Sequence, residues 1–154
     1  MAVYFFDSSS LVKRYVFEVG TAWIRGLTDP ANGNGIYVAA LTGVETVSAV
    51  TRRLRRGEMS PPDAATALAD FRRHYASVYF LIRTSPAIIA HAMELVEKHG
   101  LRAYDAVQLA TALQVQAKCR LDGTPEPTFV SADTALNAAA AAEGLAVDDP
   151  NAHP

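Results

Sequence analysis

The sequence has almost no cysteine and no long apolar segment. Cys119 is the only cysteine among 154 residues, so the chain cannot form an internal disulfide, and a reducing compartment suits it. No apolar run approaches the roughly 20 residues of a membrane-spanning helix. The N-terminus has no basic segment ahead of an apolar one, so we expect no signal peptide. These absences predict a cytoplasmic protein.

An excess of charge of either sign is also missing. The chain has 14 Lys and Arg against 16 Asp and Glu, a formal net charge of -2 at pH 7. This balance argues against a general binder of polyanions, although it leaves room for a local basic patch. Hydrophobic residues make up 50% of the chain and charged residues 19%, as in ordinary globular proteins. The length predicts a single domain over residues 1–154.

Short apolar segments alternate with segments of helical pattern along the chain. We expect strands at residues 3–6, 36–39, 78–82, 128–131 and 145–147. We expect helices at residues 8–17, 18–29, 41–56, 61–77, 86–99, 103–118 and 134–142. Near-continuous apolar strands separated by helices predict an α/β fold with a central parallel sheet of four or five strands. With helices on both faces, this is a three-layer α/β/α sandwich.

Carboxylates stand just after the predicted strands. Asp7 directly follows the first strand, and Glu45 lies in the first turn of the helix after the second. Asp133 stands where the chain enters its last helix, and Asp105, in "LRAYDAVQLA", lies in the first turn of another. Ligands of parallel sheets bind beyond the carboxyl ends of the strands. We therefore expect these four acids to converge in one crevice.

Each acid also has a purely structural interpretation. Glu45 fits a capping box with Thr42, because "TGVE" has the required spacing. Asp133 fits an N-cap, and Asp105 would favour the positive end of a helix dipole. A chain in which all of them act as caps would be a non-catalytic protein-binding module.

Taken together, the four acids predict a metal site. Like charges about 4 Å apart repel by roughly 4 kcal/mol at an effective dielectric constant of 20, and a divalent cation would offset this cost. An all-oxygen ligand set without nearby His or Cys favours Mg²⁺ or Mn²⁺ over zinc. Such ions activate water for attack at phosphorus, as in metal-dependent nucleases.

Four blocks carry a family resemblance: "FFDSSSLVKRY", "TGVETVSAVTRR", "LRAYDAVQLATAL" and "FVSADTALNAAAAAEGL". In this order they resemble the motif blocks of the PIN-domain family over nearly the whole chain. More narrowly, the chain resembles the VapC-type toxins of type II toxin–antitoxin systems. The resemblance implies a PIN-like α/β/α ribonuclease that uses Mg²⁺ or Mn²⁺. It also implies a cognate VapB-type antitoxin as partner, RNA as substrate and a homodimer.

The resemblance also implies roles for individual residues. The metal-binding and catalytic acids that it assigns are Asp7, Glu45, Asp105 and Asp133. Asp7 and Asp105 are expected as direct ligands, because their blocks match the family most closely. The other two acids are expected to ligate directly, act through water or orient the nucleophile. Ser9 and Ser131 match positions where the family often has a hydroxyl beside the acids.

Basic residues gather in two places. The run Arg52–Arg56, "RRLRR", lies near the end of a predicted helix, where positive charge is favoured in any case. The same run could contact the RNA backbone or an acidic partner segment. Lys13, Arg14 and Arg102 lie closer in sequence to the acids and are predicted to hold a phosphate of the RNA.

Two other hydrolase chemistries match parts of the chain. A strand that ends in Asp is also found in phosphoaspartyl hydrolases of the haloacid-dehalogenase type, but those carry a second acid where this chain has Ser9. The S-x-x-K pattern Ser10–Lys13 lacks the S-D-N and K-T-G partners that penicillin-binding enzymes need. The metal-dependent nuclease is therefore the preferred prediction.

Overall fold

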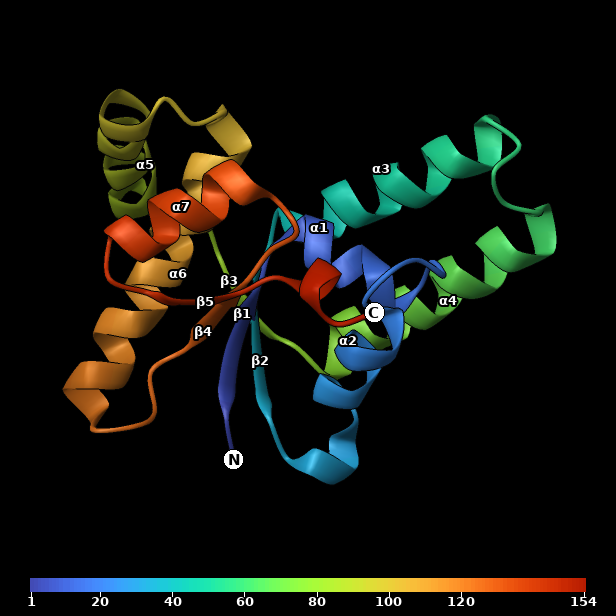
Figure 1. Cartoon of the computed structure of the whole chain (residues 1–154), viewed down its shortest axis with the longest axis horizontal. Coiled ribbons are helices and arrows are strands. Elements are labelled where there is room, and N and C mark those ends of the chain that lie inside the picture. Colours follow the sequence, from blue (N-terminus) through green and yellow to red (C-terminus); the bar gives the residue numbers. More distant parts are fainter.

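Five parallel strands form the centre of the molecule (Figure 1). The computed structural model describes residues 1–154. The strands are β1 (Val3–Phe6), β2 (Gly35–Ala39), β3 (Phe80–Ile82), β4 (Thr128–Val130) and β5 (Ala146–Asp148). Their order is β3-β2-β1-β4-β5, and every neighbouring pair is parallel. The predicted central parallel sheet is confirmed.

Helices cover both faces of this sheet. The α-helices are α1 (Ser8–Leu11), α2 (Thr21–Leu27), α3 (Thr42–Arg55), α4 (Pro61–Ser77), α5 (Pro86–His99), α6 (Ala103–Asp122) and α7 (Thr134–Ala142). The 3₁₀ turns are η1 (Val12–Arg14), η2 (Pro30–Asn32) and η3 (Pro150–Ala152). Helices α5 to α7 lie on one side of the sheet and α1 to α4 on the other (Figure 1), which confirms the three-layer sandwich. No helix is both long and apolar enough to cross a membrane.

The alternation of side chains along β1 builds two hydrophobic cores. Phe5 points to the side of α5, α6 and α7, where its ring stacks on Phe129 at a centroid distance of 5.8 Å. Phe6 points to the opposite side and packs with Phe71 of α4 and with Val130. Burying one such side chain stabilises the fold by about 1.5–3 kcal/mol. A central strand buried on both faces explains why residues 3–6 are continuously apolar.

Three helices differ clearly in length from the prediction. The first ends early, because α1 gives way after Leu11 to the tighter 3₁₀ turn η1. Helix α2 spans Thr21–Leu27 and not 18–29, because Gly20 precedes it in a left-handed conformation. Helix α6 is longer than predicted and runs to Asp122, whose carboxylate lies 2.7 Å from the ammonium of Lys118 one turn earlier. Gly123 then ends α6 in a left-handed conformation with φ of 65°.

Two glycines around α2 should respond in opposite ways to alanine. Gly20 has φ of 86°, and a Cβ there would overlap the carbonyl oxygen of Pro150, whereas a Cβ at Gly26 would meet no atom within 4 Å. Gly20→Ala should therefore lower the free energy of unfolding by more than about 1 kcal/mol, and Gly26→Ala should raise it by up to about 1 kcal/mol. Urea denaturation measures both. Equal effects of the two substitutions would show that the turn before α2 is not as tight as described.

Candidate active site

The junction of β1 and β4 is the topological switch point of the sheet. The chain continues from β1 to β2 and β3 on one side, and β4 and β5 lie on the other. Asp7 follows β1 and Ser131 follows β4, so both stand at the carboxyl ends of adjacent strands. Open α/β sheets bind their ligands in the crevice outside such a point. This edge of the sheet is the candidate site.

Asp7 is buried at this junction and fully hydrogen-bonded. Its side chain caps α1, because Oδ1 accepts a hydrogen bond from the backbone N–H of Ser10 at 2.9 Å. The Ser9 hydroxyl donates to Oδ1 at 2.8 Å, and the Ser131 hydroxyl donates to Oδ2 at 2.8 Å. Both predicted serines therefore contact Asp7, one from each side of the junction. The carboxylate has a single fixed orientation at the floor of the crevice.

Burial dominates the electrostatics of Asp7. The side chain is 3% exposed, and loss of hydration raises the pKa of its carboxyl to about 6. The hydrogen bonds from Ser10, Ser9 and Ser131 stabilise the charged form and lower the pKa, but by less than burial raises it. A nearby cation would favour the charged form further. The charged form of Asp7 therefore has no cationic side chain beside it.

Glu45 reaches across the crevice instead of capping its own helix. Leu41 is the N-cap of α3, and no side-chain hydrogen bond caps this helix. Oε2 of Glu45 accepts a hydrogen bond from Ser8 of α1 at 2.8 Å, and Oε1 accepts one from Gln108 of α6 at 3.0 Å. The same Gln108 amide also donates to Thr42 at 2.7 Å. The capping-box interpretation of Glu45 is therefore wrong.

Asp133 and Asp105 complete the acidic set at this edge. Asp133 caps α7 as its structural interpretation predicts, since Oδ1 accepts from the backbone N–H of Leu136 at 2.9 Å. Asp105 is half-buried in the first turn of α6. Burial raises the pKa of Asp105, the negative charges of Asp133 and Glu45 raise it further, and Arg102 lowers it. Asp133 and Glu45 are therefore close enough to Asp105 to repel its charge.

The oxygen atoms available as ligands at this edge suit a hard cation. No three side chains among Asp, Glu, His and Cys lie close enough to enclose an ion as they stand, so the acids form an open set. Two amide oxygens beside them, Oε1 of Gln108 and Oδ1 of Asn137, are buried without a hydrogen-bond partner. Gln108 lies one turn after Asp105, and Asn137 lies one turn after Asp133. Unpaired acceptors beside carboxylates suit a hydrated Mg²⁺ or Mn²⁺, which brings both charge and water.

Three polar residues of the site were not predicted from the sequence. Gln108 is 1% exposed and bridges α6 to α3, while Asn137 donates to the backbone carbonyl of Ser131 at 2.7 Å. Each shares a helix face with an acid one turn earlier, a spacing that could have identified it. Ser8 binds Glu45, but its position directly after Asp7 offers no such signal.

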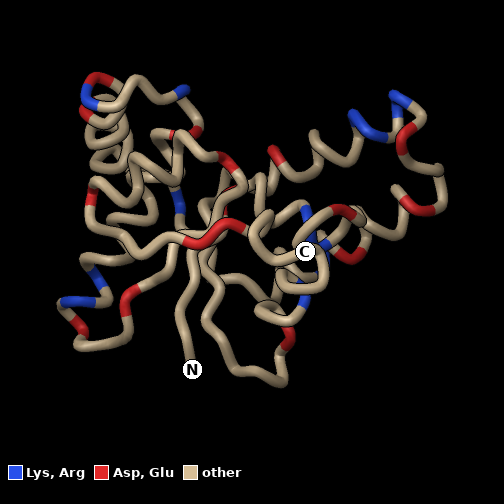
Figure 2. Tube along the Cα trace, in the orientation of Figure 1, with Lys and Arg blue, Asp and Glu red and all other residues tan.

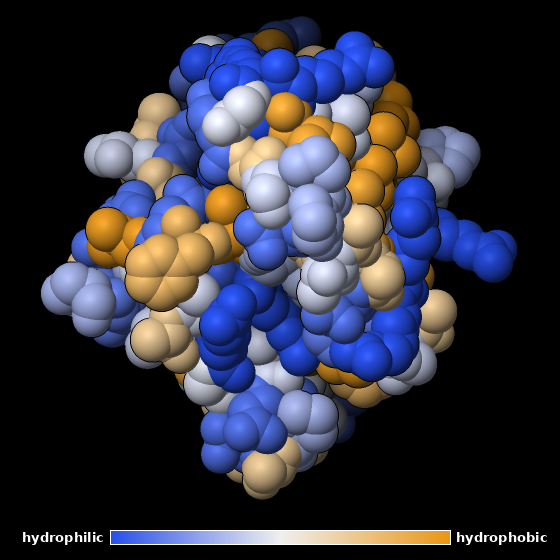
Figure 3. All heavy atoms as spheres, turned by 90° about the vertical axis from the view of Figure 1, so that its right-hand side faces the viewer, coloured by the Kyte–Doolittle hydropathy of each residue, from blue (hydrophilic) through white to orange (hydrophobic).

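The arginines at the end of α3 form a cationic surface (Figure 2). Arg53 contacts the Glu18 carboxylate at 3.2 Å, whereas Arg52, Arg55 and Arg56 are exposed. The face of the molecule that carries the ends of α3 and α4 is mainly hydrophilic, with small apolar areas between (Figure 3). Contact of this patch with RNA or a partner stays a prediction.

Lys13 does not point to a substrate. Its side chain is buried, and Nζ donates to the carbonyl oxygen of Val19 and to Oδ1 of Asn151, both at 3.0 Å. Glu18 lies 3.6 Å from the same nitrogen. Because the ammonium already has these three oxygen neighbours, the prediction that Lys13 holds a phosphate is wrong. Its role is to tie η1 to the C-terminal turn.

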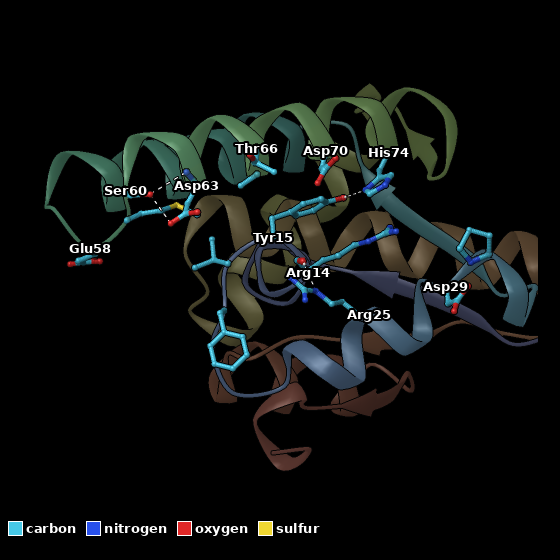
Figure 4. A pocket seen from close by; sticks show the side chains of 15 residues that line it. Arg14, Tyr15, Arg25, Asp29, Glu58, Ser60, Asp63, Thr66, Asp70 and His74 are labelled. Atoms are coloured by element: carbon cyan, nitrogen blue, oxygen red, sulfur yellow. Dashed lines mark hydrogen bonds between the residues drawn. The ribbon is translucent and has the colours of Figure 1, made fainter.

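Arg14 lines a cavity that lies away from the switch point of the sheet (Figure 4). Its guanidinium donates to the hydroxyl of Tyr79 at 2.8 Å, and the Tyr15 hydroxyl contacts both Tyr79 and Nδ1 of His74. This cavity of about 740 Å³ lies between α2 and α4 and contains none of the four acids. Arg14 therefore lies apart from the acids, and its contact with a phosphate stays a prediction. Arg102 is exposed and acts on the pKa of Asp105, so its predicted role stays open.

A second cavity, of about 610 Å³, is lined by one of the four acids, Glu45. Residues from α1, α3 and α6 line it, among them Ser8 and Ser9, which neighbour Asp7, and Tyr104, which neighbours Asp105. A ligand in this cavity can therefore reach the Glu45 carboxylate.

The PIN domain family matches residues 4–142, which include all four acids. The chain belongs to the PIN-domain family. It is 28% identical over 115 residues to ribonuclease VapC45 of Mycobacterium tuberculosis strain CDC 1551 / Oshkosh and to ribonuclease VapC49 of strain H37Rv. Each alignment covers 75% of this chain and 78% of the relative. The predicted family is therefore confirmed.

Solved structures share the fold at lower identity. PAE2754 of Pyrobaculum aerophilum has a TM-score of 0.63 at 17% identity, covering 98% of this chain and 85% of its own. FitAcB of Neisseria gonorrhoeae has a TM-score of 0.62 at 16% identity, with coverages of 96% and 97%. VapC20 of M. tuberculosis, a sarcin–ricin loop cleaving toxin, has a TM-score of 0.62 at 16% identity, with coverages of 99% and 100%.

The buried charge of Asp7 should make the metal-free protein less stable as the pH rises. Its folded pKa of about 6 lies above the ordinary value of 3.8, so between these values the native state binds more protons than the unfolded state. The free energy of unfolding therefore falls with rising pH over this window, by on the order of 3 kcal/mol from this group. Asp7→Asn should lose that part of the pH dependence.

Urea denaturation in EDTA at pH 4, 5, 6 and 7.5 measures this difference. Near neutral pH the variant should be more stable than the wild type. Parallel pH profiles for the two proteins would contradict the electrostatic description of Asp7.

Proposed function

We propose that the protein is a metal-dependent endoribonuclease that acts in the cytoplasm as the toxin of a toxin–antitoxin pair. The observation that carries this proposal is a buried Asp7 at the switch point of a PIN fold, with Asp105, Asp133 and Glu45 close enough together to act on the pKa of Asp105. Two relatives are named ribonuclease VapC, and VapC20 is described as a toxin that cleaves the sarcin–ricin loop. These names support RNA as the substrate.

The acids would hold one or two Mg²⁺ or Mn²⁺ ions. The proposed ligands and catalytic groups are Asp7, Glu45, Asp105 and Asp133. When bound, such an ion neutralises charge on a phosphodiester and lowers the pKa of water. Asp7 and Asp105 are the preferred direct ligands, because one is held in a fixed orientation at the β1–β4 junction and the other has a pKa raised by burial and by neighbouring acids.

The chain itself would orient the reacting groups. Ser9 and Ser131 hold Asp7 in place, and Ser8 and Gln108 hold Glu45. Asp133 uses Oδ1 to cap α7, which leaves Oδ2 free to accept a proton from the attacking water. Water would add to phosphorus while the bond to the leaving oxygen breaks in line with it. Fixed carboxylates favour this geometry because no reorganisation is needed during the reaction.

Arg102 is the preferred candidate for a phosphate contact. It is the exposed N-cap of α6, and its charge lowers the pKa of Asp105. A guanidinium in this position can pair with a phosphate next to the one that is cut.

Two alternatives lose support. In a binding module whose acids only cap helices, Glu45 would cap α3, but it contacts Ser8 and Gln108 instead. A phosphoaspartyl hydrolase of the haloacid-dehalogenase type would need a second acid two residues after Asp7, where this chain has Ser9. Ser9 instead donates a hydrogen bond to Asp7.

Removing one charge from the acidic set should abolish cleavage. Asp7→Asn or Asp105→Asn keeps the side-chain shape but removes a charge that the cation needs, so RNA cleavage should fall by more than about a hundredfold. The assay follows a mixed structured RNA in Mg²⁺, Mn²⁺ or EDTA. The matched control is Asp122→Asn, an exposed carboxylate about 25 Å away along the same helix as Asp105.

The control variant should cleave at the wild-type rate and be stabilised by Mn²⁺ to the same extent. Both site variants should fold but lose most of this Mn²⁺ stabilisation. Cleavage that persists in EDTA, or at the wild-type rate in both site variants, would falsify the mechanism.

A VapB-type antitoxin is the proposed protein partner. The solved structures with the same fold include a toxin–antitoxin complex from Klebsiella pneumoniae and VapBC2 of Rickettsia felis bound to a promoter DNA fragment. On the helix that carries Glu45, Val44 is 75% exposed, which leaves apolar surface for a partner segment. We propose that the antitoxin lays such a segment across the helices and presents a basic side chain to the acids.

Expression of this protein alone should therefore slow bacterial growth, and co-expression of its cognate antitoxin should restore it. Asp105→Asn should be harmless in both cases, because it lacks nuclease activity. Growth curves at matched protein levels measure the effect. Equal growth with and without the antitoxin would contradict the toxin role and leave the nuclease role standing.

We also propose that the protein is a homodimer. On α5, Ile89, Met93 and Val96 are 43%, 59% and 37% exposed, and their spacing places them on one face of the helix. Exposed apolar stripes of this kind commonly pack against another chain. A second copy of the protein would cover this stripe.

A further inference from the structure

Tyr104 is a large aromatic side chain that lies outside both hydrophobic cores. It lies in the first turn of α6, next to Asp105, and is 66% exposed. It takes no part in either hydrophobic core, although the residues that follow it, from Ala106 onward, are buried in one of them. An exposed ring gains little stability from burial. The position of this ring next to Asp105 therefore leaves it available to contact a ligand.

The ring forms one wall of the second cavity. Glu45 lies in the same cavity, and Arg52 lies two turns further along α3. The volume of about 610 Å³ is within the range that accommodates a nucleotide-sized ligand. An aromatic ring, a carboxylate and a guanidinium therefore line the same cavity.

Positive charge continues from this cavity along α3. Arg52 and Ala49 also line a neighbouring hollow, whose other walls are Arg53, Arg56 and Glu58. Arg53 is paired with Glu18, so Arg52 and Arg56 supply the free charges of a track that leads toward the end of α3 (Figure 2). A ring followed by a line of guanidiniums matches the base and then the successive phosphates of a single strand.

We propose that Tyr104 stacks on an unpaired base of the RNA at the cleavage site, and that Arg52 binds the backbone of the adjoining nucleotides. The inference rests on the proposed nuclease function and defines its substrate class. A base within a helix is stacked on its neighbours and cannot lie on a side chain, so the substrate is cut in a loop or another single-stranded segment. An acidic protein segment would use the arginines but would not need the ring.

Three variants separate these contributions. Tyr104→Ala removes the ring, Tyr104→Phe keeps it, and Arg52→Gln removes one charge from the track. The matched control is Phe17→Ala, because Phe17 is 91% exposed and lies outside the second cavity. All four proteins should melt at the wild-type temperature and be stabilised equally by Mn²⁺, since none of these side chains is buried or acidic.

Binding is measured by fluorescence anisotropy with a labelled single-stranded RNA of randomised sequence and with a labelled RNA duplex. Tyr104→Ala should weaken binding of the single strand and reduce kcat/KM for the mixed RNA by about ten- to a hundredfold. Tyr104→Phe should stay within about twofold of the wild type, and duplex binding should not respond to either change. Arg52→Gln should lower the slope of log K against log salt by about one.

The outcomes distinguish this inference from the proposed function. If the wild type cleaves but Tyr104→Ala matches Phe17→Ala in binding and in kcat/KM, the stacking role is overturned and the nuclease stands. If Tyr104→Ala cleaves normally but escapes inhibition by the antitoxin, the ring is a protein contact and the inference is equally overturned. A wild type that binds the single strand no better than the duplex overturns it without reference to catalysis.

Discussion

The rest of the site depends on how the protein accommodates the buried carboxylate of Asp7. Burial of this carboxylate at the β1–β4 junction removes its hydration, which raises its pKa to about 6. Hydrogen bonds from Ser10, Ser9 and Ser131 offset part of this loss and fix the carboxylate in one orientation. A cation beside Asp7 would stabilise its charged form. The same group that destabilises the protein near neutral pH is therefore the first candidate ligand of the proposed metal ion.

The fold holds the other acids near this point without burying them. Two separate cores clamp the sheet from both faces, so the carboxyl ends of the strands and the helices that follow keep a fixed relation. Glu45, Asp105 and Asp133 are only half-buried; hydrogen bonds from α1 and α6 hold Glu45, and the first turn of its own helix α7 holds Asp133. No three of these carboxylates enclose an ion as they stand, and Glu45 lines a cavity of about 610 Å³.

Local patterns predicted what local physics determines. The strand at Val3–Phe6 and the helix at Thr134–Ala142 appear where they were predicted, because an apolar run and an Asp N-cap act within their own segments. The predictions failed where the deciding contacts come from elsewhere in the chain. Lys13 is held by the C-terminal turn, 138 residues away, and Glu45 by α1 and α6, so neither spacing nor proximity in sequence could reveal their partners. The placement of Asp7 directly after β1 and of Asp133 shortly after β4 followed from the strand pattern, because these strands are neighbours in the parallel sheet. The role of the four acids stays a prediction.

The central claim is that these acids form one cation site. It is tested most directly by a crystal structure of the protein soaked in MnCl₂, with anomalous scattering recorded near the manganese edge. An anomalous peak in contact with carboxylate oxygens of both Asp7 and Asp105 is the predicted result. Well-ordered crystals that show no peak at this edge of the sheet under saturating Mn²⁺, or a peak only at other residues, would contradict it.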